Sequence, residues 1–349
     1  MGQKWRFAII TLTLMTFGLV LQVAPATAAD DAITLRLSTF FPDSHCTNQD
    51  MHFPLAKEIE KATNGQVKIK IFTGGVLGKA TTHYDMAAKG VVDITQGIQG
   101  FTTGRFPLTS VVELPFLFPL GMSAVTCNQI IWELFQNVPE LQAEYSDTKV
   151  LAIFVNEPGN VYTRSRLIKT LDDFKGQKIR CPMAASAGMI NALGGSPVTI
   201  ATGELYLALE KGVVDGTLFN TANMNDWKLW EVVKKYTEGN FYNLAWFSVM
   251  NLKTWNKLPQ EAQEAIEAAY GLNAGKKVGL GFDDDYAKNV KIAKEKGVEI
   301  YKLPAEERDR WRQATQPVYD SWVKQMEDRG LPGKKVLAEV QKLIAKYSE

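Results

Sequence analysis

The chain has 349 residues, of which 46% are hydrophobic and 22% charged, and its formal net charge is +1. A charge so close to zero gives no electrostatic basis for binding nucleic acid or an anionic membrane. The length and the apolar content are sufficient for two hydrophobic cores, which predicts two lobes.

Residues 1–28 are predicted to be a cleaved signal peptide. A basic start, MGQKWR, precedes an apolar run at 7–23, and the small residues Ala26-Thr27-Ala28 follow it. This order is typical of secretory signals, and a membrane anchor is the alternative. We therefore expect cleavage after Ala28 and export to the periplasm as a soluble protein.

Strands and helices alternate through the first third of the chain. Strands are predicted at 33–39 and 67–72, where apolar residues alternate, and at 90–94, with helices ending near residues 62 and 89. This β-α-β-α-β order predicts a mostly parallel sheet with right-handed crossovers. A helix at 123–135 and a central strand at 150–155 follow.

The remainder predicts a second α/β lobe and a return to the first. Short strands are expected at 161–165, 177–181, 198–199 and 216–219, and a buried strand at 243–251. Helices near 305–329 and 334–347 end the chain. The predicted division is lobe I at 29–155 plus 245–280 and lobe II at 156–244 plus 281–349, with a cleft between them.

A helical pattern runs from 259 to 296, which is long enough to exceed one small domain. We expect one long helix that leans on both lobes. Its middle contains four residues that weaken a helix: Gly271, Gly275, Gly279 and Gly281. Two helices broken near Gly279 are the alternative.

Catalytic patterns are sparse. The three histidines, His45, His52 and His83, lack the spacing of a helical zinc pair, and no nucleophile elbow, phosphate loop or dinucleotide fingerprint is present. The acidic run at 283–285 is expected to be the polar face of a solvated helix. The sequence therefore predicts no enzyme, no metal site and no cofactor.

Three cysteines in an exported chain favour one disulfide and one free thiol. Cys46 and Cys127 both lie near predicted helix starts, and Cys181 lies on a predicted buried strand. A Cys46–Cys127 bridge is the expected pairing, and three unpaired thiols are the alternative.

The segment 178–220 is the most informative of the chain. It reads KIRCPMAASAGMINALGGSPVTIATGELYLALEKGVVDGTLFN, and its first predicted strand ends near Arg180. Open α/β sheets bind ligands at the carboxyl ends of their strands. An arginine placed there offers a planar fork of donors that matches a carboxylate.

This segment resembles the substrate-binding proteins of TRAP transporters. The segment matches almost all of their pattern, which is K-(I/L)-R-x-P, then LG-(A/G)-x-PV, then E-x-Y-x-AL-x-x-G-V-V-D-G. The resemblance extends over about residues 33–330. It implies a two-lobed periplasmic binding protein that closes on an organic acid, with Arg180 on the carboxylate. It also implies a monomer that delivers the ligand to TRAP membrane permease subunits driven by a sodium gradient.

The chain departs from many relatives after the V-V-D-G motif. Their turn reads Q-E-N-P, and here it reads Thr217-Leu218-Phe219-Asn220. Phe219 takes the place of a carboxylate-binding asparagine, unless the loop shifts by one residue and Asn220 serves instead. A second family arginine has no clean match, and Arg164 is near but out of register.

Apolar side chains are expected to line the cleft beside Arg180. They are Phe40, Phe41, Tyr162, Met183, Phe219, Trp246 and Phe247. Such a pocket favours a monocarboxylate with an apolar or aromatic body over a polyhydroxylated sugar acid. The alternatives are an ABC-type binding protein, a ligand sensor for a receptor kinase, and a periplasmic hydrolase or isomerase.

Overall fold

A computed structural model describes residues 32–182 and 184–348, apart from the side chains of residues 184 and 185. The predicted signal peptide and Met183 lie outside the described residues. Within the described part, no helix combines the length and the apolar character needed to cross a membrane.

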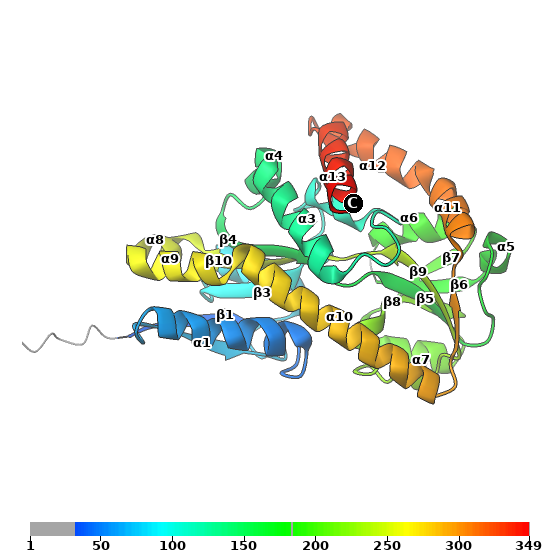
Figure 1. Ribbon diagram of the computed structural model, residues 1–349, viewed down its shortest axis with the longest axis horizontal. Helices are drawn as coiled ribbons and strands as arrows, with labels where there is room; N and C mark the ends of the chain where they lie inside the picture. Colours follow the sequence, from blue (N-terminus) through cyan, green and yellow to red (C-terminus); the bar gives the residue numbers. More distant parts are fainter. Residues whose placement is uncertain (1–31, 183, 349) are drawn as a thin grey trace, which may run out of the picture. The chain divides into compact units, whose positions relative to one another are not determined.

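The first sheet has five strands in the order β2-β1-β3-β10-β4 (Figure 1). Its strands are β1 (Ile33–Ser38), β2 (Val67–Phe72), β3 (Ile94–Ile98), β4 (Thr148–Val155) and β10 (Ala245–Asn251). Strand β1 runs parallel to β2 and β3, as predicted, with Ile33 opposite Val67. Strand β10 is antiparallel to both β3 and β4.

The second sheet has six strands in the order β11-β9-β5-β8-β6-β7. They are β5 (Gly159–Thr163), β6 (Lys178–Cys181), β7 (Ser196–Thr199), β8 (Gly216–Asn220), β9 (Lys235–Tyr242) and β11 (Glu299–Lys302). Strand β5 is antiparallel to both neighbours, and β6 is parallel to β7 and β8. The predicted α/β class is confirmed, but each sheet is mixed because one inner strand returns antiparallel.

Helices cover the two sheets (Figure 1). The α-helices before the second sheet are α1 (Phe53–Ala62), α2 (His83–Ala88), α3 (Ala124–Asn137) and α4 (Pro139–Ala143). Those that follow are α5 (Leu171–Phe174), α6 (Ala184–Ala192), α7 (Leu205–Glu210), α8 (Leu252–Lys257), α9 (Gln260–Ala269), α10 (Gly271–Glu295), α11 (Ala305–Ala314), α12 (Gln316–Asp328) and α13 (Gly333–Ser348). Short helical turns are η1 (Thr47–His52), η2 (Ala80–Thr82), η3 (Gln99–Phe101), η4 (Thr109–Glu113), η5 (Thr202–Glu204), η6 (Thr221–Asn223) and η7 (Leu229–Glu231).

The predicted helix at 259–296 is two helices, and the break is not at Gly279. It lies between Tyr270 and Gly271, where Tyr270 leaves the helical region with ψ −143° and Gly271 adopts φ +56°. A positive φ is easily adopted only by glycine, so the sequence places a suitable residue at the break. Helix α10 then continues without interruption through Gly279.

The other glycines of α10 permit close packing. A Cβ on Gly279 would lie 2.8 Å from backbone atoms of Val125 in α3, and one on Gly281 would lie 2.5 Å from the Asp50 carboxylate. The backbone of α10 therefore approaches the first lobe more closely than a side chain would permit. These glycines serve the contact between helices, which sequence reasoning did not anticipate.

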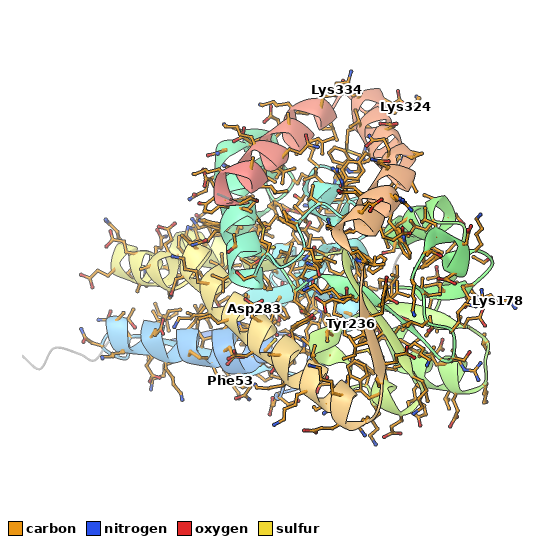
Figure 2. The ribbon with its side chains drawn as sticks, turned by 45° about the vertical axis from the view of Figure 1, so that its right-hand side comes forward. Phe53, Lys178, Tyr236, Asp283, Lys324 and Lys334 are labelled. Atoms are coloured by element: carbon orange, nitrogen blue, oxygen red, sulfur yellow. The ribbon has the colours of Figure 1, made fainter. Side chains whose placement is uncertain are left out.

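Helix α10 contacts segments that precede and follow β5, as the prediction of a bridging helix required. On the first-lobe side, Asn128 Nδ2 donates to Gly275 O at 3.0 Å, and Asp283 accepts from Ala124 N at 2.9 Å. On the second-lobe side, Asn289 Nδ2 donates to Ala222 O at 2.8 Å. Figure 2 shows Asp283 on this helix, and its half-buried carboxylate therefore serves the start of α3 rather than only a solvated face.

Helices α12 and α13, which the predicted division assigned to the second lobe, contact segments of the first lobe. Val340 and Leu343 of α13 share a buried cluster with Leu134 of α3. Tyr319 Oη in α12 donates to Pro115 O at 2.7 Å. The apolar faces of these helices were visible in the sequence, but periodicity does not say which surface an apolar face will cover.

Candidate ligand-binding site

Arg180 is the third residue of β6 and is 1% exposed. Three of its five N–H donors bind protein acceptors: Nε to Ile200 O at 2.9 Å, Nη2 to Thr202 Oγ1 at 3.1 Å and Nη1 to Leu218 O at 3.4 Å. Two donors on the terminal nitrogens therefore have no acceptor within the described residues. No carboxylate there forms an ion pair with Arg180, and burial lowers its pKa. A buried guanidinium in this state is suited to receive an anion.

Phe219 shares the face of the sheet on which Arg180 lies. Arg180 pairs with Thr217 in the parallel β6–β8 register, and side chains two residues apart on a strand point to the same side. The guanidinium carbon of Arg180 lies 5.7 Å from the centroid of the Phe219 ring. Asn220 points to the other face, where its Nδ2 donates to Glu157 O at 2.9 Å. The alternative in which Asn220 replaces the family asparagine is thus not favoured by this geometry.

The aromatic residues of the first lobe form one stack at the ends of β1 and β10. The rings of Phe41 and Trp246 are 4.9 Å apart and nearly parallel, and Phe40 lies 4.1 Å from Phe41. Trp246 is 1% exposed, and its Nε1 has no acceptor within the described residues. The structure therefore brings Phe40, Phe41 and Trp246 together, but it records no contact between this stack and Phe219.

Three predicted site residues are placed elsewhere. Arg164 lies next to the start of β8, against Gly212, whereas Phe219 lies near the end of that strand. Phe247 packs on the other face of its sheet against Tyr84, with ring centroids 5.4 Å apart. Tyr162 is a core residue whose Oη lies 2.6 Å from Thr221 Oγ1. Arg164 is close in sequence to the position of the second family arginine, but it does not lie at the end of the sheet where Phe219 lies.

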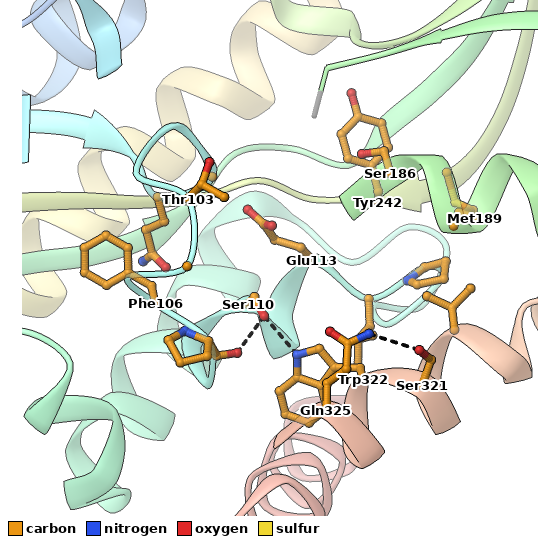
Figure 3. A pocket seen from close by; sticks show the side chains of 18 of the residues that line it. Thr103, Phe106, Ser110, Glu113, Ser186, Met189, Tyr242, Ser321, Trp322 and Gln325 are labelled. Atoms are coloured by element: carbon orange, nitrogen blue, oxygen red, sulfur yellow. Dashed lines mark hydrogen bonds between the residues drawn. The ribbon is translucent and has the colours of Figure 1, made fainter. Parts of the chain in front are cut away.

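A cavity of about 1050 Å³ begins beside the Arg180 strand (Figure 3). Pro182, Ser186, Tyr242 and Glu113 line it, together with residues of α12. Oε1 of Glu113 accepts from Ala245 N at 3.0 Å, and burial raises the Glu113 pKa to about 7. Burial raises the pKa of Tyr242. Sequence reasoning missed Glu113 and Tyr242; an acid inside the apolar run VVELPF was the available signal.

Glu157 is a second acid that sequence reasoning missed. It follows β4, is 2% exposed, and its Oε1 accepts from Ala222 N at 2.9 Å. Its Oε2 has no partner within the described residues, and burial raises its pKa well above the usual range. Through its bond from Ala222 N, Glu157 joins the end of β4 to η6.

The expected Cys46–Cys127 bridge is not formed. All three cysteines are free and buried. Cys46 packs in the cluster that contains Leu37 and Leu55, whereas Cys127 belongs to the cluster that contains Phe247 and Val340. The two thiols thus face different hydrophobic cores, and two nearby helix starts do not imply adjacent side chains.

A buried arginine at the carboxyl end of a sheet, an adjoining cavity and a helix that touches two mixed sheets define a solute-binding protein. Residues 37–325 match the family model for "Bacterial extracellular solute-binding protein, family 7" (DctP), and the chain belongs to this family. The predicted resemblance to TRAP solute-binding proteins is confirmed, and the family is one of binding proteins rather than enzymes.

Solved structures share the fold over nearly the whole chain. A TRAP solute-binding protein from Rhodoferax ferrireducens T118, in complex with copurified benzoate, is 30% identical with a TM-score of 0.84 over 91% of this chain and 99% of its own. A marine metagenome protein specific for aromatic acid ligands, in complex with 3-hydroxybenzoate, has the same sequence identity and TM-score, and the same fractions of both chains are covered.

A relative found by sequence is the C4-dicarboxylate-binding periplasmic protein DctP of Rhodobacter capsulatus, which is 27% identical over 75% of this chain and 78% of its own.

Proposed function

We propose that this protein is the periplasmic receptor of a TRAP transporter for organic monocarboxylates with an apolar or aromatic body. The lobes close on the ligand, Arg180 binds its carboxylate, and the closed protein delivers it to the membrane permease subunits without turnover. It acts as a monomer, exported by its signal peptide. The observation that carries the proposal is the buried Arg180 guanidinium, which has two unused donors and no carboxylate partner within the described residues.

The electrostatics support a ligand with one carboxylate near Arg180. An unpaired buried charge is costly, and an anionic ligand that accepts from the two remaining donors offsets this cost. Arg308 offers a comparison, since it is also buried without an ion pair, but its Nε and Nη2 donate to Gly239 O and Phe118 O at 2.8 and 2.7 Å. Gly239 lies in β9 and Phe118 lies in a loop, so Arg308 joins two segments of the chain.

The apolar surroundings support an aliphatic or aromatic ligand body. Phe219 covers one side of Arg180, and Phe40, Phe41 and Trp246 form the aromatic end of the first lobe. Hydroxyl-rich ligands would lose water without regaining as many hydrogen bonds, at about 1–3 kcal/mol for each unsatisfied group. The relatives with benzoate and 3-hydroxybenzoate agree with this choice, and the C4-dicarboxylate relative represents the competing class.

Arg180→Ala tests the proposal, with calorimetric titration of benzoate and a thermal-shift screen of small organic acids. Removal of one partner of a buried charge pair costs about 3–5 kcal/mol, so affinity should fall by more than about a hundredfold. Arg180→Lys should also bind poorly because an ammonium cannot reproduce the planar fork. Arg164→Ala, at the other end of the sheet, is the matched control and should bind normally. Affinity within threefold of the unsubstituted protein in Arg180→Ala would refute the proposal.

A further inference from the structure

The Arg180 guanidinium is held along one of its edges by a single short segment of the chain. Its Nε donates to Ile200 O at 2.9 Å, and its Nη2 donates to Thr202 Oγ1 at 3.1 Å. Nε and Nη2 lie along the same edge of the planar group, because the five N–H donors form a rigid fork. The segment 200–202 therefore occupies this edge, and it leaves no place there for a ligand.

The topology of the second sheet explains why this segment lies at Arg180. Strand β7 is parallel to β6, with Val198 opposite Arg180, so the two strands end side by side. The chain stays extended after β7 until η5 begins at Thr202. Thr202 is half-buried, whereas Gly203 and Glu204 are exposed. The turn therefore presents one side chain to Arg180 and the rest of its residues to solvent.

The donors that remain free lie at the end of the fork. Nη1 of Arg180 donates to Leu218 O at 3.4 Å, so Nη1 and Nη2 each keep one N–H that has no acceptor in the part of the chain that the structure describes. Nε has a single N–H, which Ile200 O already accepts. The two oxygens of a carboxylate match a pair of donors on neighbouring guanidinium nitrogens. The fork thus offers its Nη1–Nη2 end to a ligand, and not its Nε edge.

We infer that Thr202 is a positioning residue, which orients Arg180 so that Nη1 and Nη2 bind the ligand carboxylate end-on. This inference rests on the proposed function, because it takes Arg180 as the residue that binds the carboxylate. Thr202 acts through Arg180 rather than on the ligand. Its hydroxyl group fixes the rotation of the guanidinium before the ligand arrives, and a group that is already oriented loses less conformational entropy on binding.

The position of Thr202 on an open turn separates this role from a role in folding. A Cβ on the adjacent Gly203 would meet no atom within 4 Å, so the turn is not tightly packed. Removal of the Thr202 hydroxyl group should therefore leave the thermal unfolding temperature of the ligand-free protein unchanged. A loss of affinity without a loss of stability is then a consequence of the orientation of Arg180.

Thr202→Val tests the inference, because valine keeps the shape of the side chain and removes the hydroxyl group. Calorimetric titration of benzoate should show affinity about tenfold lower in Thr202→Val and within about threefold of the unsubstituted protein in Thr202→Ser, which keeps the hydroxyl. Thr199→Val makes the same exchange at the end of β7, where the hydroxyl lies 3.6 Å from Cys181 Sγ. This matched control should bind normally. Unchanged affinity in Thr202→Val, or an equal loss in Thr202→Ser, overturns the inference.

A crystal structure of the unsubstituted protein with bound benzoate tests the binding mode without any substitution. One carboxylate oxygen should lie on each of Nη1 and Nη2 of Arg180. Nε should still donate to Ile200 O, and Nη2 should still donate to Thr202 Oγ1. A carboxylate oxygen on Nε, or a Thr202 hydroxyl turned away from Nη2, overturns the inference.

The two proposals fail in different ways. Loss of benzoate binding in Arg180→Ala together with normal binding in Thr202→Val would leave the proposed function intact and remove this inference. A carboxylate on the Nε edge of Arg180 would do the same. Retained affinity in both Arg180→Ala and Thr202→Val would remove both proposals.

Discussion

The guanidinium carbon of Arg180 lies 5.7 Å from the centroid of the Phe219 ring. The two side chains belong to neighbouring parallel strands and share one face of the sheet. A cation near an aromatic face is attracted by the ring quadrupole by about 0.5–2 kcal/mol. The ring also excludes water from one side of the guanidinium, which strengthens the binding of an anion on the other side.

Replacement of Phe219 should change which acids the protein prefers, while the strand that carries Arg180 stays folded. Phe219→Asn should lower benzoate affinity by about tenfold and lower succinate affinity less, because the lost contact is aromatic. Phe219→Leu keeps an apolar side chain and should retain most of the preference. Calorimetric titrations of both acids check this. An equal loss for the two acids would show that Phe219 supports the core rather than the ligand.

The protonation of Glu113 should make the stability depend on pH. Burial raises its pKa from 4.5 to about 7, so the folded protein holds a proton that the unfolded chain releases between these values. The free energy of unfolding should therefore fall as pH rises through this window, by about 3 kcal/mol in total. His45 and His52, with pKa values lowered by burial to about 3 and about 4, act in the opposite sense.

Urea unfolding of the protein and of Glu113→Gln isolates the effect of this acid. The amide does not titrate, so the variant should gain stability relative to the unsubstituted protein between about pH 5 and about pH 8. The histidines are present in both proteins and cancel in the difference. A difference that is constant across this range would mean that Glu113 is charged in the folded state.

The close contact between α10 and α3 should be sensitive to one methyl group. A Cβ at Gly279 would meet the backbone of Val125 at 2.8 Å, and two backbones cannot move aside as a flexible side chain can. Gly279→Ala should therefore lower the free energy of unfolding by about 1–3 kcal/mol, despite the better helix propensity of alanine. Thermal and urea unfolding measure this change.

Gly188→Ala is the matched control for a glycine inside a helix. Its nearest neighbours would be Val318 methyl groups at 3.9 Å, which is ordinary contact distance. This substitution should be neutral or stabilising by up to about 1 kcal/mol, because alanine favours the helix. Equal effects of the two substitutions would show that propensity, not the approach of α10 to α3, governs Gly279.

Thiol labelling distinguishes the free cysteines from the bridge that the sequence favoured. Cys46, Cys127 and Cys181 are buried and free, and burial raises the pKa of the Cys46 and Cys127 thiols. The reactive thiolate is therefore scarce as well as inaccessible in the native protein. Mass spectrometry should find no label before unfolding and three labels per chain after unfolding without reductant. A single label per chain after unfolding would show that two of the cysteines form a disulfide.

The local sequence was sufficient for several strands and for locating Arg180 near the end of one of them. Alternation of apolar residues predicted β1 and β2 closely, since period-2 patterns follow from the geometry of a strand with one buried face. The 178–216 segment pointed to Arg180 because its motifs are spaced as strands and helices that follow one another directly along the chain. A strand and its following loop are close in sequence, so the residue type at the strand end is informative by itself.

Other features depended on contacts between distant segments. Glu113 and Tyr242 are far apart in sequence, and only the antiparallel return of the chain brings them to one cavity with the Arg180 strand. From the sequence, the glycines of α10 were expected to weaken the helix, whereas in the structure Gly279 permits α3 to pack closely against it. Cys46 and Cys127 entered separate cores for the same reason: helix periodicity determines which residues share a face, whereas packing against the rest of the chain determines what that face meets.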